Sequence, residues 1–92
     1  MYFVTTVDTS IDDTRCVGYF KTFKEAEDIV LNNTCDIWET CYDLVIIENI
    51  PEGLYQYDLD AKWYKWNDKD KQYEKLDTKP KMYESQIGFA IG

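Results

Sequence analysis

Five short stretches of the chain combine β-branched and aromatic residues with alternating or uninterrupted apolar positions, which predicts β-strands. Two polar stretches, residues 8–13 and 67–71, separate neighbouring strands and are typical of hairpin loops. Residues 44–47 are apolar on both faces, so we expect this strand near the middle of a sheet. The predicted strands are residues 2–7, 14–20, 42–50, 62–66 and 72–76.

One stretch has helical spacing instead. Thr22 and Glu25 form a T-x-x-E capping box, in which each side chain is expected to satisfy a free backbone N–H. Asn32 and Asn33 are suited to end the helix, because asparagine tolerates the left-handed conformation. The apolar stripe consists of Phe23, Ala26, Ile29 and Val30. The charged residues that we expect to face water are Lys24, Glu25, Glu27 and Asp28.

The order of these elements is β-β-α-β-β-β. It predicts one α+β domain over residues 1–92, with an antiparallel sheet of about five strands and one main helix packed on one face. The chain length suits one domain and not two. The sequence is less decisive for three other stretches. Residues 35–41 form either a further helical turn or a loop, and residues 81–92 form either a helical turn or a last strand. Residues 54–59 are compatible with an extended segment at the sheet edge.

The net charge is −8, from 10 basic and 18 acidic side chains. We therefore expect neither direct nucleic-acid binding nor contact with an anionic membrane, whereas a basic protein partner would be attracted. Residues 1–46 hold three basic and nine acidic side chains, and residues 47–92 hold seven and nine. Lysine is therefore concentrated in the second half of the chain.

No pattern of catalytic or metal-binding residues is present in the sequence. The chain has no histidine, and Cys16, Cys35 and Cys41 are an odd number without CxxC spacing. We expect free thiols, no metal, no cofactor and no enzymatic activity. The first residues show neither a basic start nor a long apolar run, so we predict no signal peptide, no membrane span and a cytoplasmic location.

The predicted hairpin at 62–76 places aromatic rings on both faces of its first strand. One set of rings can enter the core, and the other is expected on the surface, or against a subunit or a ligand. A core role with cross-strand aromatic pairs, a dimer surface, and a stacking surface for a base beside lysines for a phosphate all remain open. With the single arginine of the chain, the candidate ligand-binding residues are Arg15, Lys62, Tyr64, Lys65, Trp66, Tyr73 and Lys75.

Acidic side chains in the first half provide an alternative site. Arranged on one side, these carboxylates could mimic nucleic-acid phosphates and occupy a basic cleft, although a solvated surface that serves solubility is the simpler explanation. The candidate partner-binding residues are Asp8, Asp12, Asp13, Glu25, Asp28, Asp36 and Glu39.

Several segments together resemble a family of small uncharacterised acidic proteins from Gram-positive bacteria and their phages. They are "YFVTT" at 2–6, "VGYF.TF.EA" at 17–26, "NN..DI.E" at 32–39, "VIIE.I.EGLY" at 45–55, "KWYKW" at 62–66 and "GFAIG" at 88–92. The resemblance implies no catalytic residues. It implies a setting in which small proteins counter host defence in the host cytoplasm.

Two functions follow as hypotheses. In the first, a homo-oligomeric protein sequesters a nucleotide-derived immune signal in an aromatic and basic pocket. In the second, the acidic half inhibits a host defence nuclease or another basic effector.

Overall fold

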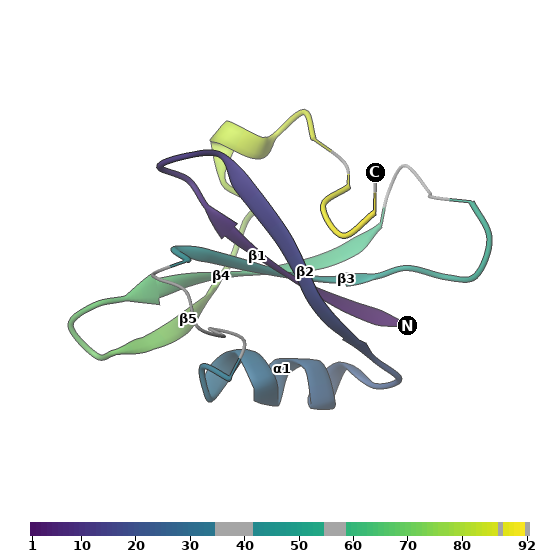
Figure 1. Ribbon diagram of the computed structural model, residues 1–92, viewed down its shortest axis with the longest axis horizontal. Coiled ribbons are helices and arrows are strands. Elements are labelled where there is room, and N and C mark those ends of the chain that lie inside the picture. The colour runs from purple at the N-terminus through teal and green to yellow at the C-terminus, as the bar shows by residue number, and fades with distance from the viewer. Residues whose placement is uncertain (35–41, 55–58, 87, 92) are drawn as a thin grey trace.

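The computed structural model describes residues 1–34, 42–54, 59–86 and 88–91 (Figure 1). Within these ranges the chain forms five strands, one α-helix and a short 3-10 helix. The predicted α+β class and the order β-β-α-β-β-β are confirmed. The elements are β1 (Tyr2–Asp8), β2 (Asp13–Phe20), α1 (Phe23–Leu31), β3 (Leu44–Asn49), β4 (Asp60–Asn67), β5 (Gln72–Leu76) and η1 (Lys81–Tyr83).

All five strands belong to one antiparallel sheet with the order β2-β1-β3-β4-β5 (Figure 1). β3 lies in the middle, as its uninterrupted apolar run predicts. β1–β2 and β4–β5 are the two predicted hairpins. The register between β1 and β2 shifts between Val4 and Thr5, which is the signature of a β-bulge in the edge strand.

Helix α1 covers one face of this sheet (Figure 1). The Thr22 hydroxyl accepts a hydrogen bond from the Glu25 N–H at 3.2 Å, which confirms the predicted helix start. The Glu25 carboxylate accepts from that same hydroxyl at 2.9 Å rather than from a backbone N–H, so the capping box is only half formed. Asn32 caps the other end, and Asn33 has a φ of 56°, the left-handed conformation expected there.

The core beneath α1 contains the apolar stripe of the helix and two tyrosines of the β4–β5 hairpin. Glu27, which was predicted to face water, is half-buried and accepts a hydrogen bond from the Tyr64 hydroxyl at 2.6 Å. That prediction was wrong because Glu27 lies on the side of the helix turned toward the sheet. The buried residues of this cluster are Val4, Ala26, Val30, Val45, Ile47, Tyr64 and Tyr73.

The opposite face of the sheet is covered by residues 80–86 and 88–91, here called the C-terminal segment and drawn yellow in Figure 1. Its Tyr83 ring stacks on Trp63 with centroids 5.7 Å apart. Its Phe89 ring meets Trp63 edge-on at 5.0 Å. Of the two interpretations of residues 81–92, the helical turn is confirmed as η1, and the described part of this stretch contains no strand.

Both ring-bearing faces of β4 are therefore buried within one chain. Tyr64 is fully buried under α1, and Trp63 is 4% exposed under the C-terminal segment. The expectation that one set of rings must lie on the surface or against another molecule was wrong, because this segment supplies a second apolar layer from the same chain. Trp66 is half-buried and packs edge-on against Tyr73.

The structure describes none of one less certain stretch and only the ends of another. Residues 35–41, predicted as a further turn or a loop, lie outside the described ranges, as do 55–58 of the predicted edge segment. Leu54 and Leu59, which flank that gap, belong to no strand. No helix in the described part of the chain has the length and apolar character needed to cross a membrane.

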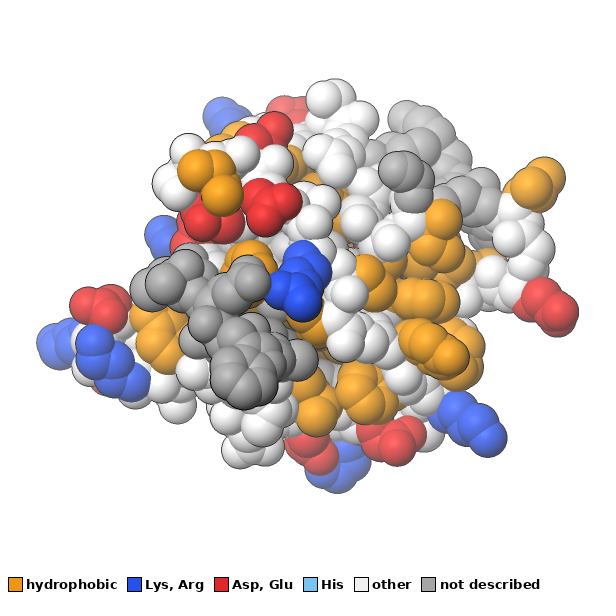
Figure 2. Space-filling model, in the orientation of Figure 1, with side chains coloured by type: hydrophobic (Ala, Val, Ile, Leu, Met, Phe, Trp, Pro, Cys, Tyr) orange, Lys and Arg blue, Asp and Glu red, His pale blue; other side chains and the backbone are white. Residues whose placement is uncertain are grey.

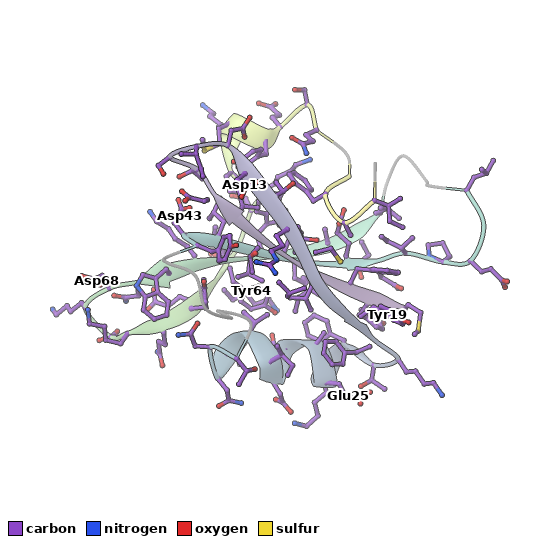
Figure 3. The ribbon with its side chains drawn as sticks, in the orientation of Figure 1. Asp13, Tyr19, Glu25, Asp43, Tyr64 and Asp68 are labelled. Atoms are coloured by element: carbon purple, nitrogen blue, oxygen red, sulfur yellow. The ribbon has the colours of Figure 1, made fainter. Side chains whose placement is uncertain are left out.

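The Tyr64 hydroxyl, which lies between the sheet and α1 in Figure 3, provides a test of the helix packing. Burial raises its pKa, and the hydrogen bond to the Glu27 carboxylate and the charge of that group raise the pKa further, so the hydroxyl remains a donor at neutral pH. We expect Tyr64→Phe to lower the free energy of unfolding by about 1–2 kcal/mol in urea denaturation. Tyr19→Phe, on an exposed ring of β2, should change it by less than about 0.5 kcal/mol. Equal losses in the two variants would contradict this.

Candidate functional site

A pocket of about 400 Å³ opens where β5 separates from β4. The pairing of these two strands ends at Trp63 and Leu76. Beyond that point the chain leaves the sheet through residues 77–79, while β4 extends three residues further as 60–62. Among the described residues, no strand lies next to this length of β4 on its outer side, and the pocket lies beside it.

Aromatic and apolar residues form part of the pocket lining, here called the floor. They include Trp63 and Phe89, whose rings are perpendicular to each other, together with Leu76 and Ala61. Trp63 is 4% and Phe89 is 9% exposed, so the packing of the second face fixes both rings. A planar ligand entering here would meet rings that are already ordered, which lowers the entropic cost of binding.

Lysine side chains border this floor. The Lys79 ammonium lies 5.8 Å from the centroid of the Phe89 ring and donates to the Gln86 carbonyl. Lys62 also lines the pocket and forms an ion pair with Asp60 at 3.5 Å. Lys75 lines it as well, but its ammonium lies 5.9 Å from the Phe23 ring, on the helix side of the sheet. Lys79 is therefore the cation best placed to meet an anionic group in the pocket.

Glu48 connects the pocket wall to the central strand. This glutamate is 1% exposed, and its carboxylate accepts hydrogen bonds from the N–H groups of Phe89 at 3.3 Å and Ala90 at 2.9 Å. Hydrogen bonds to a buried carboxylate are among the stronger ones in proteins. Glu48 therefore positions the Phe89 ring that forms part of the floor.

Sequence reasoning missed Glu48, although a signal was present. Period-2 alternation places Glu48 on the same strand face as Leu44 and Ile46. A carboxylate on the inward face of an apolar strand requires hydrogen-bond donors, and this pattern could have marked it.

The rings proposed as ligand-binding residues do not line the pocket. Tyr64 and Tyr73 are buried beneath α1, and the Tyr73 hydroxyl donates to the Tyr42 carbonyl at 2.7 Å. Trp66 lies on that same face of β4. Trp63, which the ligand-binding prediction left out, is among the described residues that line the pocket.

The proposed basic residues are also divided. Lys62 and Lys75 line the pocket, whereas Lys65 is exposed near the β4–β5 loop, opposite Glu74. Arg15 is exposed on β2, three strand spacings from β4, which corresponds to about 14 Å at ordinary strand separation. The seven predicted residues therefore do not form one site in the chain.

The predicted acidic residues fall into two groups. Asp8, Asp12 and Asp13 surround the tip of the β1–β2 hairpin, where Figure 2 shows acidic side chains gathered at upper left. Glu25 and Asp28 belong to α1, and Figure 3 shows Asp13 in the upper part of the view and Glu25 near its lower edge, beside α1. Asp36 and Glu39 lie outside the described residues.

The hairpin tip has a defined internal structure. The Asp8 carboxylate accepts from the Ser10 N–H and hydroxyl at 3.0 and 2.6 Å. Asp43, just before β3, accepts from the Thr9 N–H at 2.8 Å and from the Thr9 hydroxyl. Burial raises the pKa of Tyr83, and the charges of Asp12, Asp43 and Asp8 raise it further, so this tip and the C-terminal segment are neighbours.

The described residues hold no cluster of three or more acidic, cysteine or histidine side chains that could bind a metal ion. Cys16 is an exposed free thiol, and Cys35 and Cys41 lie outside the described ranges. Comparison with known proteins found no match to a family model, to a curated protein or to a solved structure.

Removing the Glu48 charge tests whether this residue holds the pocket wall. We expect Glu48→Gln to lower the free energy of unfolding in urea by about 1–3 kcal/mol, because an amide cannot match the charged acceptor. Amide hydrogen exchange at Phe89 and Ala90 should accelerate more than exchange in β1. Glu52→Gln, at an exposed position, should change neither measurement. Unchanged exchange at Phe89 and Ala90 in Glu48→Gln would refute the positioning role.

Proposed function

We propose that the protein is a non-enzymatic binding protein that holds a small anionic, ring-bearing ligand in the pocket between β4, β5 and the C-terminal segment. One observation carries this proposal: the Lys79 ammonium lies 5.8 Å from the centroid of the Phe89 ring, and this ring packs against Trp63 in the pocket lining. The volume of about 400 Å³ is within the range of small-molecule sites.

Lysine placement supports an anionic ligand despite the net charge of −8. Three of the ten basic side chains belong to residues that line this pocket, whereas Asp77 and Glu48 are its acidic members. The carboxylate of Glu48 is directed to main-chain N–H groups of the C-terminal segment. The lining therefore holds more lysine than acidic residues, which is the reverse of the balance in the whole chain.

A nucleotide combines the two features that this pocket suits, a flat ring and a phosphate. With the resemblance to proteins of Gram-positive bacteria and their phages, the proposal extends to a phage-type anti-defence protein that sequesters a nucleotide-derived immune signal in the host cytoplasm. Sequestration requires binding alone, which agrees with the absence of a catalytic motif in the sequence. The homo-oligomeric state stays a prediction, since the pocket walls described above come from one chain.

Isothermal titration calorimetry with nucleoside monophosphates, cyclic nucleotides and ADP-ribose-type nucleotides tests this function. We expect binding by at least one member of the panel, weakened about tenfold by Lys79→Gln through loss of a charge-assisted contact. Lys69→Gln, in the exposed β4–β5 loop, removes the same charge and should bind like the wild type. No heat and no thermal shift across the panel would exclude the proposal.

The acidic hairpin tip supports a second candidate, an inhibitor that docks on a basic effector. Ile11 is 70% exposed at this tip, between the acidic residues Asp8 and Asp12. The side chains of Asp12 and Asp13 are exposed and form no hydrogen bond or ion pair with other described residues. An apolar residue ringed by carboxylates matches a basic surface with an apolar centre.

Charge reversal at the tip tests this second candidate. The double variant Asp12→Lys, Asp13→Lys should lose capture of a basic effector from host lysate, and 0.5 M salt should abolish capture by the wild type. Glu52→Lys with Glu84→Lys makes the same change in net charge at other exposed sites and should leave capture intact. Capture that survives both salt and the tip reversal would rule out the acidic inhibitor.

A further inference from the structure

The unpaired length of β4 has a defined hydrogen-bonding direction. In an antiparallel sheet, consecutive residues of a strand direct their N–H and C=O groups alternately toward the two neighbouring strands. The Trp66 N–H donates to the Asp43 carbonyl at 2.9 Å, on the β3 side. Even-numbered residues of β4 therefore face β3, and odd-numbered residues face β5.

The unpaired length of β4 consists of residues 60–62, and Ala61 is its odd-numbered residue. Its partner would be Thr78, but β5 ends at Leu76 and no pairing of Ala61 with Thr78 is formed. Ala61 lines the pocket, and its main chain makes no other hydrogen bond within the described ranges. Its N–H and C=O thus point together into the space between β4 and residues 77–79.

From this geometry we infer that the Ala61 main chain forms two hydrogen bonds to the edge of the bound ring. The pocket then selects rings that carry a hydrogen-bond acceptor and a donor side by side. This inference rests on the proposed function and narrows its ligand class to nucleobase-type rings. The Ala61 N–H donates to an acceptor on the ring edge, either a carbonyl oxygen or a ring nitrogen. The Ala61 C=O accepts from the neighbouring N–H, which belongs to the ring or to an exocyclic amine. The aromatic floor then lies beside the ring, and Lys79 lies beside the phosphate.

The chemistry of the pocket favours this assignment over a plain aromatic anion. When a ligand displaces water from the Ala61 N–H and C=O, these groups lose their hydrogen bonds to water. A ring that offers them no replacement therefore binds more weakly. Uracil offers a carbonyl next to its N3–H, which complements the pair at Ala61. Methylation at N3 removes the donor and leaves ring size, charge and stacking nearly unchanged.

The test compares uridine monophosphate with N3-methyluridine monophosphate by calorimetry on the full chain. We expect the unmethylated nucleotide to bind about tenfold or more tightly. Equal affinities for the two compounds would overturn the inference while the proposed function stands. Adenosine monophosphate with its N6,N6-dimethyl derivative serves as a second pair in the same format, with the same expectation. Failure of all four nucleotides to bind would overturn the inference, and failure of the whole panel above would also remove the function.

A protein variant probes the same contact from the other side. Ala61→Pro removes only an N–H that points away from β3, which an edge position tolerates. We expect this variant to bind the two uridine nucleotides with equal, weak affinity. Thr14→Pro removes an outward N–H on the opposite edge of the sheet and should keep the wild-type preference. A preference for uridine monophosphate that persists in Ala61→Pro would contradict the contact, and the ligand comparison on the wild type holds if Ala61→Pro does not fold.

Discussion

The hydrogen bonds from Phe89 and Ala90 to the Glu48 carboxylate join the C-terminal segment to the central strand, and the second apolar layer depends on them. A single helix can cover only one face of a five-stranded sheet. Without this segment, Trp63, Ile46 and Leu44 would be left in water. The buried charge has a desolvation cost, and the main-chain donors offset it in one geometry only. That restriction gives the segment a unique position on the sheet.

The same attachment creates the pocket. Residues 77–79 must leave the sheet early so that the C-terminal segment can cross the second face, and this departure ends β5 at Leu76. β4 is therefore longer than its neighbour, and the gap between them becomes a cavity bounded by Phe89. Packing of the core and formation of the candidate site are thus two results of one chain path.

Local sequence signals predicted most of the fold. Thr22 and Asn33 marked the helix ends, and the apolar run of β3 predicted a central strand, because these signals depend only on neighbouring residues. The candidate site was predicted poorly. Period-2 alternation placed Tyr64 and Trp63 on opposite faces of β4 correctly, but it does not say what covers each face.

The errors concern contacts between distant parts of the chain. Arg15 was grouped with the β4–β5 hairpin, and only the strand order shows that β1 and β3 separate them. The C-terminal segment lacks helical or strand periodicity, so its role as a covering layer left no pattern in the sequence. Ala61 has no distinguishing chemistry as a residue type, and its importance arises only from the unequal lengths of β4 and β5.

The two outer edges of the sheet also bear on how the chain avoids aggregation. An open strand edge is a template for pairing with other chains. β2 carries a bulge together with the exposed charges of Asp13 and Arg15, and these features oppose flat intermolecular pairing. On the other side of the sheet, the outer strand β5 has only 5 residues, and the charged side chains of Glu74 and Lys75 are exposed on it. Within the described part of the chain, both outer strands of the sheet thus carry features that oppose edge-to-edge association with another copy.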